Sequence, residues 1–296
     1  MILVVGSGFL GSYLLKQAVT QTDEPILATV CDPKNALPLK NVKYIQCDVT
    51  KRADLTELAK ECRGEPLKVF FLAACHNIDY VYENPEEAWK VNVESVREFL
   101  SIFPNIDKLL FASTDCVYGE NNNKYPKFNE ESALNPVNEY GRQKLEAEKI
   151  VQSAGFTAVR LPFMLGPSLL SRPHFYDRIC SDLSNNNPVE MIDGLRRSVL
   201  SYHSVAEILV SLASLPMKLP EALNVCGDTD YSKYEVGCIL AKKIGAPLSL
   251  VRKISEEQGE KFFKDKRASC SIMDNERLKA LLGLTKKIRW EDHICL

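Results

Sequence analysis

The sequence predicts an α/β protein with a doubly wound parallel sheet and a smaller C-terminal lobe. Short apolar runs alternate with helical patterns over the first two thirds of the 296 residues, and the first run leads into a Gly-x-Gly-x-x-Gly motif. Apolar strands that alternate with helices are typical of a parallel sheet covered on both faces. We therefore expect one large sheet to organise most of the chain.

The first predicted strand, residues 2–6, runs directly into the glycine motif, and residues 10–21 continue as a helix. In this setting the motif is the fingerprint of a Rossmann dinucleotide-binding unit. Gly6 permits the tight turn, Gly8 lets a pyrophosphate approach the backbone, and Gly11 lets helix and strand pack closely. The residues expected to contact the dinucleotide here are Gly6, Gly8, Phe9, Leu10 and Gly11.

The second predicted strand, residues 26–31, ends at Asp32, about twenty residues after the motif, as the fingerprint requires. A carboxylate there can accept both ribose hydroxyls of NAD and would repel the 2′-phosphate of NADP. The sequence therefore favours NAD. NADP stays open, because Lys34 follows two residues later and can reach a phosphate.

The remaining pattern gives the other strands of the sheet and its helices. Strands are expected at 43–47, 68–73, 108–113, 157–161 and 222–226, and helices at 52–62, 85–103, 137–154 and 203–215, the last with Ser204 as its cap. Two short groups of residues lie at the carboxyl ends of the third and fourth strands, at the edge of the sheet where open α/β sheets bind ligands. We expect an adenine and its ribose to contact Asp48, Val49, Leu72, Ala73 and Ala74.

The less regular segments carry aromatic, Asn and Pro residues and predict the smaller lobe. We expect residues 1–165 to form the dinucleotide-binding domain, with 200–226 returning to it, and residues 166–199 and 227–296 to form a substrate-binding lobe.

Composition narrows the class of protein. With 45% hydrophobic residues, 26% charged residues and a net charge of -2, the chain gives no electrostatic reason to expect nucleic acid or a membrane surface as a partner. The apolar start lacks a basic leader and is too short to span a bilayer, so a cytoplasmic location is expected. The four histidines are far apart in the sequence and show no metal-ligand spacing, so we expect no structural metal.

Tyr140 and Lys144 are four residues apart in a predicted helix and therefore share one face. A phenol titrates near ~10 in water, and a neighbouring ammonium group favours the phenolate and lowers that pKa. The spacing predicts a tuned acid and base. By itself it is weak evidence, because the same spacing arises by chance in many helices.

Several motifs follow one another along the chain: the fingerprint, Asp32, Asp48, Leu-Ala-Ala at 72–74, Ser-Thr at 113–114 and Tyr-x-x-x-Lys at 140–144. With these motifs in this order, the chain resembles the extended short-chain dehydrogenase/reductase superfamily. Within it the chain looks most like the dTDP-4-dehydrorhamnose reductase family. That likeness rests on residues 73–79, 83–92, 113–118 and 136–141, and on Arg-Ala-Ser-Cys-Ser-Ile-Met-Asp at 267–274.

The resemblance implies a reductase that uses NAD or NADP to reduce a keto group on a nucleotide-linked sugar. It implies that Tyr140 protonates the oxygen, that Lys144 holds the nicotinamide ribose and lowers the Tyr140 pKa, and that Thr114 aims its hydroxyl at the same oxygen. Asn92 is expected to support the cofactor through backbone partners, or to be a plain buried amide. Substrate contacts are expected from His76, Asp115 and Phe163, and a homodimer through the helices that contain Trp89 and Tyr140.

Two other functions stay open. The motif ending Gly-Phe-Leu-Gly is closer to nucleotide-sugar epimerases, which use the same Tyr, Lys and Thr. A dehydratase is disfavoured because Asp115 is followed by Cys116 rather than by a second acid. The regulatory subunit of methionine adenosyltransferase also resembles this family, so a cofactor-binding subunit without catalysis is the third alternative.

Overall fold

The predicted parallel sheet is present in the computed structural model, which describes residues 1–62, 64–120 and 127–294. Seven strands pair in the order β11-β7-β5-β4-β1-β2-β3, and every pairing is parallel. The strands are β1 (Ile2–Val5), β2 (Ile26–Val30), β3 (Val42–Gln46), β4 (Leu67–Phe71), β5 (Ile106–Thr114), β7 (Thr157–Leu161) and β11 (Ala222–Asn224). The predicted fold class is confirmed, and the chain order reverses between β1 and β4.

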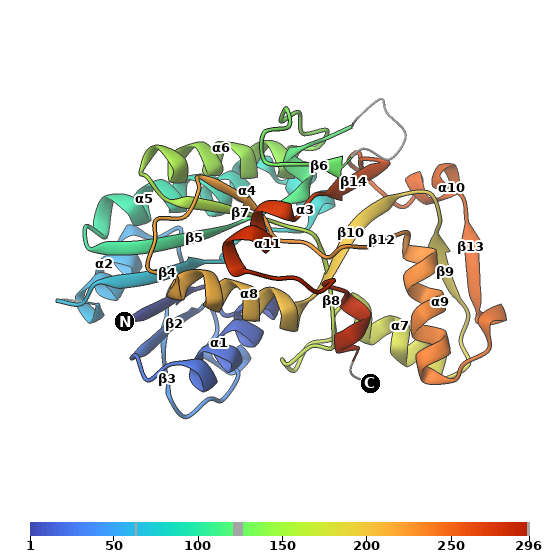
Figure 1. The fold of residues 1–296 in the computed structure, drawn as a ribbon, viewed down its shortest axis with the longest axis horizontal. Helices are drawn as coiled ribbons and strands as arrows, with labels where there is room; N and C mark the ends of the chain where they lie inside the picture. The colour runs from blue at the N-terminus through green and yellow to red at the C-terminus, as the bar shows by residue number, and fades with distance from the viewer. Residues whose placement is uncertain (63, 121–126, 295–296) are drawn as a thin grey trace.

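Helices cover both faces of this sheet (Figure 1). On one face α1 (Phe9–Gln21) packs along α8 (Tyr202–Ser214). On the other lie α2 (Arg52–Glu61), α5 (Ser95–Ile102) and α6 (Glu139–Ser153). Among the described residues, no helix is both long and apolar enough to cross a membrane.

Alternation along each strand divides the core between the two faces. In β1, Val4 joins the cluster under α1 and α8, whereas Leu3 and Val5 join the cluster under α2 and α5. Successive side chains of a strand point to opposite faces, so a strand buried on both sides must be apolar throughout. This is why the strands read as unbroken apolar runs.

One predicted helix, residues 85–103, is irregular in the structure. It consists of α4 (Pro85–Trp89), a π-helical segment at Lys90–Glu94 that we call the π segment, and α5, preceded by the short α3 (Ile78–Glu83). A π turn inside an α-helix is rare and often lies at a functional site. The buried Asn92 lies in the π segment.

The predicted cap of α8 is wrong. The capping residue is Ser201, whose hydroxyl accepts a hydrogen bond from the Ser204 amide at 2.9 Å, so Ser204 lies inside the first turn. Both serines satisfy the pattern of a cap. The strand before the helix ends at Ser201, and this long-range pairing decides between them.

The remaining strands and helices lie mostly beyond the carboxyl edge of the large sheet, to the right in Figure 1. A second sheet has the order β12-β10-β14-β6, and β8 also pairs with β10. Its strands are β6 (Lys127–Phe128), β8 (Phe163–Leu165), β10 (Arg196–Ser201), β12 (Asp230–Tyr231) and β14 (Cys270–Met273).

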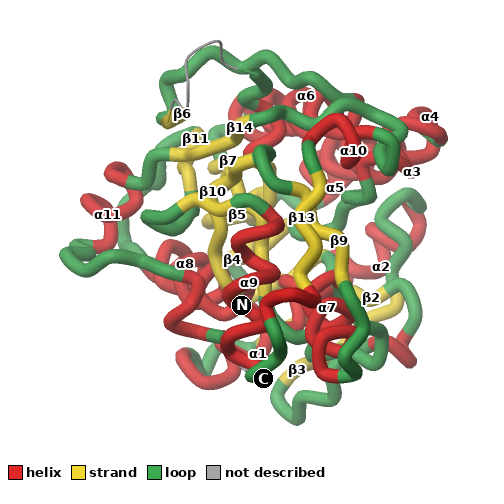
Figure 2. Tube along the Cα trace, turned by 90° about the vertical axis from the view of Figure 1, so that its right-hand side faces the viewer, coloured by secondary structure: helices red, strands yellow, loops and turns green. Residues whose placement is uncertain are grey.

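A further parallel pair, β9 (Val189–Ile192) and β13 (Val251–Ile254), packs with α7 (Phe175–Ser184) and α9 (Lys233–Ile244), as Figure 2 shows from the side. Two short helices, α10 (Glu256–Glu260) and α11 (Glu276–Leu282), and a final 3-10 turn at Trp290–His293 complete this region. A third apolar cluster, which includes Val189, Leu240 and Trp290, forms its core. The division into a cofactor domain and a substrate lobe stays a prediction, because β6 lies within 1–165 yet pairs with β14.

Candidate functional site

A cavity of about 420 Å³ opens where β1, β2, β4 and β5 end. This edge holds the point where the chain order reverses, and open α/β sheets bind ligands there. The predicted cofactor residues that line it are Gly6, Gly8, Phe9, Leu10, Gly11, Asp32, Asp48, Val49, Leu72, Ala73 and Ala74. Of the residues predicted to contact cofactor, only Asn92 and Lys144 are not among those that line the cavity.

The glycine motif forms a tight turn that leaves the start of α1 open. Gly6 has a φ of +100°, and a Cβ there would lie 2.7 Å from the Ala73 nitrogen, while a Cβ on Gly11 would lie 2.3 Å from the Gly6 oxygen. At Gly8, the N-cap of α1, a Cβ would meet nothing within 4 Å. The protein therefore tolerates a side chain at Gly8, and the space beside it belongs to the cavity.

Two carboxylates stand at the far end of the cavity. Asp32 is exposed and accepts a hydrogen bond from the Lys34 amide at 3.0 Å, and the Lys34 side chain is not among the residues that line the cavity. Asp48 accepts hydrogen bonds from the amide and hydroxyl of Thr50 at 3.0 and 2.7 Å, and these bonds hold its pKa below the ordinary value. Asp48 is therefore a carboxylate at neutral pH, and the oxygens of both side chains are suited to accept hydrogen bonds from hydroxyl groups.

Asn92 lies behind the wall of the cavity. Its amide oxygen accepts from the Cys75 nitrogen at 2.8 Å, and its amide nitrogen donates to the Cys75 oxygen at 3.1 Å and to Gln143 at 3.0 Å. It thereby fixes the loop that follows β4 and joins that loop to α6. The backbone contacts that we expected of Asn92 are present, and its link to the cofactor stays a prediction.

Tyr140 lines the cavity from α6, and its hydroxyl contacts Thr114 at the end of β5, which is not itself among the residues that line the cavity. Asn138 caps α6 by accepting from the Gly141 amide at 2.8 Å, which sets the first turn that carries Tyr140. Burial raises the pKa of Tyr140 above its ordinary value, Cys116 and Asp115 add to the rise, and a hydrogen bond with Thr114 opposes it. Tyr140 is consequently a neutral phenol at pH 7.

Lys144 lies one turn further along α6 and is buried. Its ammonium group stands 3.9 Å from the centre of the Phe111 ring. Burial lowers the pKa of Lys144 to about 7, and Glu148 opposes the shift. The expected lowering of the Tyr140 pKa by Lys144 is therefore not present, because desolvation dominates Tyr140 and the Lys144 charge rests on an aromatic face.

The three predicted substrate residues have different surroundings. His76 lines the cavity, and desolvation lowers its pKa. Asp115 is buried and forms an ion pair with Arg197 at 3.1 Å. Phe163 does not line the cavity; its ring packs edge-on against Phe175, with 5.6 Å between the ring centres.

Two further side chains that the sequence did not indicate, Arg172 and Tyr202, line the cavity. Arg172 lines the cavity with its guanidinium 4.7 Å from the centre of the Phe9 ring. Tyr202 lines it too, and its hydroxyl lies 3.4 Å from His174 Nε2. These side chains come from irregular segments or from a helix start, and no local pattern marks them as neighbours of the glycine motif.

Two histidines that are far apart in the sequence meet in the structure. The rings of His203 and His293 stack with 4.5 Å between their centres, although ninety residues separate them in the chain.

Known proteins of similar sequence include one described as an epimerase and one described as a methionine adenosyltransferase subunit. The chain is 27% identical to the uncharacterized UDP-glucose epimerase YtcB of Bacillus subtilis, over 98% of this chain and 97% of that protein. It is 26% identical to methionine adenosyltransferase 2 subunit beta of Bos taurus, in an alignment that spans 65% of this chain and 59% of the bovine protein.

Solved structures share the fold. MoeE5 in complex with UDP-glucuronic acid and NAD superposes with a TM-score of 0.82 at 21% identity, covering 98% of this chain and 95% of that one. A hypothetical dTDP-4-dehydrorhamnose reductase from Sulfolobus tokodaii gives a TM-score of 0.80 at 21% identity and covers 100% of both chains.

The family model described as the RmlD substrate binding domain matches residues 1–295. This match covers both the large sheet with its cavity and the region beyond it. The chain therefore belongs to the RmlD substrate binding domain family, within the extended short-chain dehydrogenase/reductase superfamily.

Proposed function

We propose that the protein is an NAD(P)-dependent reductase of a keto group on a nucleotide-linked sugar. The observation that carries the proposal is a neutral phenol, Tyr140, at the cavity and in hydrogen-bond contact with Thr114. Reduction of a ketone needs a proton donor at the oxygen, and a phenol with a raised pKa keeps its proton at neutral pH until a developing alkoxide takes it. The reduced nicotinamide would supply the hydride.

The residues of the cavity fit a dinucleotide. The open start of α1 beside Gly8 offers backbone amides to a pyrophosphate, and the Arg172 guanidinium adds a positive charge beside Phe9. Asp32 at the other end would accept ribose hydroxyls, which favours NAD over NADP. The relatives of known structure that were solved with NAD support the same choice.

Cationic side chains near Asp115 favour an anionic substrate. Arg197 forms an ion pair with Asp115. Burial lowers the pKa of the nearby Lys233 to about 8, and repulsion by the positive charges of Arg197 and Arg267 adds to the shift. Crowded cations of this kind are relieved by a diphosphate, which nucleotide-linked sugars carry. Of the substrate residues, only His76 lines the cavity; Asp115 stays in the proposal through its ion pair with Arg197, and Phe163 does not, because its ring packs on Phe175.

An epimerase is the second candidate, because the similarity to the Bacillus subtilis protein extends over the whole chain. An epimerase must first oxidise its substrate, and that step needs a phenolate. The raised pKa of Tyr140 keeps the phenol protonated, which is the form that a reductase needs before it binds its ketone. A regulatory subunit, which the bovine relative supports, would bind the cofactor without turnover.

One assay separates the three functions. Purified protein is mixed with NADH and a panel of 4-keto sugars linked to dTDP or UDP, and the absorbance of NADH is followed. A reductase consumes NADH in proportion to one of these substrates. In a second mixture with NAD⁺ and UDP-glucose, an epimerase forms UDP-galactose with no net change in NADH, because the hydride that NAD⁺ takes from the sugar is returned to it. A regulatory subunit reacts in neither mixture, so either of these results would contradict the proposal.

A further inference from the structure

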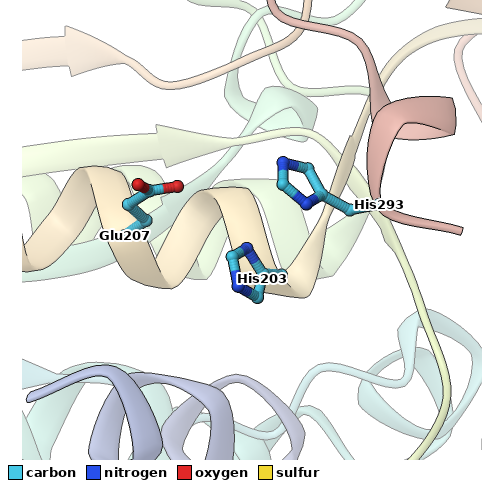
Figure 3. A group of neighbouring side chains, drawn as sticks. All are labelled: His203, Glu207 and His293. Carbon is cyan, nitrogen blue, oxygen red and sulfur yellow. The ribbon is translucent and has the colours of Figure 1, made fainter. Parts of the chain in front are cut away.

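Outside the cavity, three side chains with metal-binding atoms meet at the surface. His203 and Glu207 lie one turn apart on α8, and His293 reaches them from the final turn of the chain, as Figure 3 shows. One ligand atom from each residue can be chosen so that all three lie within 4.8 Å of one another. Two residues four apart on a helix present their side chains to the same side, as in known zinc sites.

The elements that carry these groups are firmly held. The helix α8 buries Val205, Ala206 and Leu209 against the large sheet. His293 belongs to the same turn as Trp290, which is 1% exposed and packs in the third apolar cluster. A site built on rigid elements needs only side-chain rotations to close around an ion.

The ligand atoms are free to bind. Among the described residues, no hydrogen bond or ion pair engages the Glu207 carboxylate or the ring nitrogens of His203 and His293. The rings of His203 and His293 stack with 4.5 Å between their centres, so their nitrogens lie beside each other and next to Glu207.

We propose that His203, Glu207 and His293 bind one divalent ion of the zinc class and thereby fasten the final turn of the chain to α8. Two imidazoles and one carboxylate with an open fourth position are a donor set that zinc accepts, and nickel and copper suit the same nitrogen ligands. In a tetrahedral zinc site the ligand atoms are about 3.3 Å apart. Exposed side chains can cover the remaining distance by changing rotamer.

The test is a calorimetric titration of the full-length protein, freed of metal by a chelator, with zinc chloride. We expect one site with micromolar or tighter affinity, lost at least tenfold in His203→Gln combined with His293→Gln and weakened in Glu207→Gln. The control Glu57→Gln removes an equivalent surface carboxylate from α2 and should bind as the wild type does. At about a hundredfold excess over the dissociation constant, zinc should raise the wild-type melting temperature by ~4 °C and leave the double variant unchanged.

The ten cysteines require a second measurement, because thiolates also bind zinc. Cobalt(II) bound to nitrogen and oxygen ligands lacks the intense near-ultraviolet thiolate bands, so their absence would support the histidine site. Thiolate bands, no zinc binding by the wild type, or unchanged affinity in the double variant would each overturn the proposal. Equal melting temperatures of wild type and double variant without metal would show that the variant folds.

Discussion

Tyr140 and Lys144 receive pKa shifts in opposite directions from one cause. Burial disfavours the charged form of each, so the phenol keeps its proton and the amine releases it more readily. The sequence spacing indicates only that the two side chains share a face. Their neighbours, Thr114 and Phe111, decide what each can do.

Tyr140→Phe removes one hydroxyl from the candidate acid. We expect turnover of the identified keto sugar to fall by roughly 10²- to 10⁴-fold, the usual worth of a positioned acid, with folding and NADH affinity retained. Steady-state kinetics and NADH fluorescence titration measure the two effects. Tyr82→Phe, an exposed tyrosine, is the matched control. A rate within a few-fold of wild type would assign the proton to another group.

Lys144→Met makes the pH dependence of stability testable. The folded-state pKa of Lys144, about 7, lies below that of the unfolded chain, so between these values the unfolded state binds more protons. The free energy of unfolding therefore rises with pH across this window. Below the window Lys144 is charged in both states, so burying its charge lowers stability by a constant amount. Relative to Lys144→Met, the wild type should gain stability between about pH 7 and about pH 9 in urea unfolding. A constant difference between the two proteins would contradict the assigned shift.

Asp32→Ser tests the choice of cofactor. With Asp32 in place, NADH should bind more tightly than NADPH, because the carboxylate repels the 2′-phosphate. The substitution should reduce or reverse this difference in affinity. Calorimetric titration of both cofactors gives the ratio. Arg172→Ala, at the pyrophosphate end of the cavity, should weaken both cofactors equally. If the wild type preferred NADPH, the role of Asp32 would be wrong.

At the scale of elements, the glycine motif separates binding from folding. Gly8→Val adds a branched side chain where the protein leaves open space, so the melting temperature should change little while cofactor affinity falls at least tenfold. Gly11→Val is the contrasting variant, since its Cβ would collide with the Gly6 oxygen and the fold itself should suffer. Unchanged affinity in Gly8→Val would mean that the motif is only a turn.

A buried ion pair joins α6 to the sheet. Arg160 on β7 pairs with Glu148 at 2.9 Å and donates to the Tyr118 hydroxyl at 2.9 Å, and Ser113 donates to Glu148. Both charges are fully desolvated, so neither is tolerable without the other. The pair thereby fixes α6, and with it Tyr140, against the end of β5.

At the scale of the whole molecule, the chain at residues 264–267 forms a strap that connects the region beyond the large sheet to α3 and α6. Asp79 on α3 accepts from the Lys264 amide at 2.9 Å and from Arg267 at 2.9 Å. The same strap reaches the start of α6, where the Asp265 carboxylate accepts from the Glu139 amide at 2.9 Å. Loosening the strap would disturb the turn that carries Tyr140.

Asp79→Ala should release this strap without unfolding the protein. We expect limited chymotrypsin digestion to cleave several-fold faster after Phe262, which is 64% exposed. The urea midpoint should fall only slightly, because an ion pair between partly exposed side chains contributes little to stability. Mass spectrometry locates the cut, and Asp107→Ala, an exposed aspartate on β5, is the control. Equal cleavage rates would show that Asp79 does not hold the strap.

The sequence predicted the large sheet because most of its strands are local apolar runs, and β1 and β2 are buried on both faces. It did not predict the second sheet, since strands such as β12 and β14 are short and pair with β10 across long separations. The same limit applies to the site. The glycine motif and Asp32 are local signals, whereas Arg172 and the pair of His203 with His293 meet only through tertiary packing. The homodimer through the helices of Trp89 and Tyr140 stays a prediction.

The π segment at Lys90–Glu94 limits how the chain can change in length. A π turn holds one residue more than an α turn, and this extra residue sets the phase in which Asn92 faces Cys75 and Gln143. Deleting one residue here would restore a regular helix and rotate Asn92 by about 100° away from both. Substitutions at the exposed Lys90 and Glu94 leave that phase intact. The exposed positions of this segment can therefore change in residue type, whereas Asn92 and the number of residues in the segment must be kept.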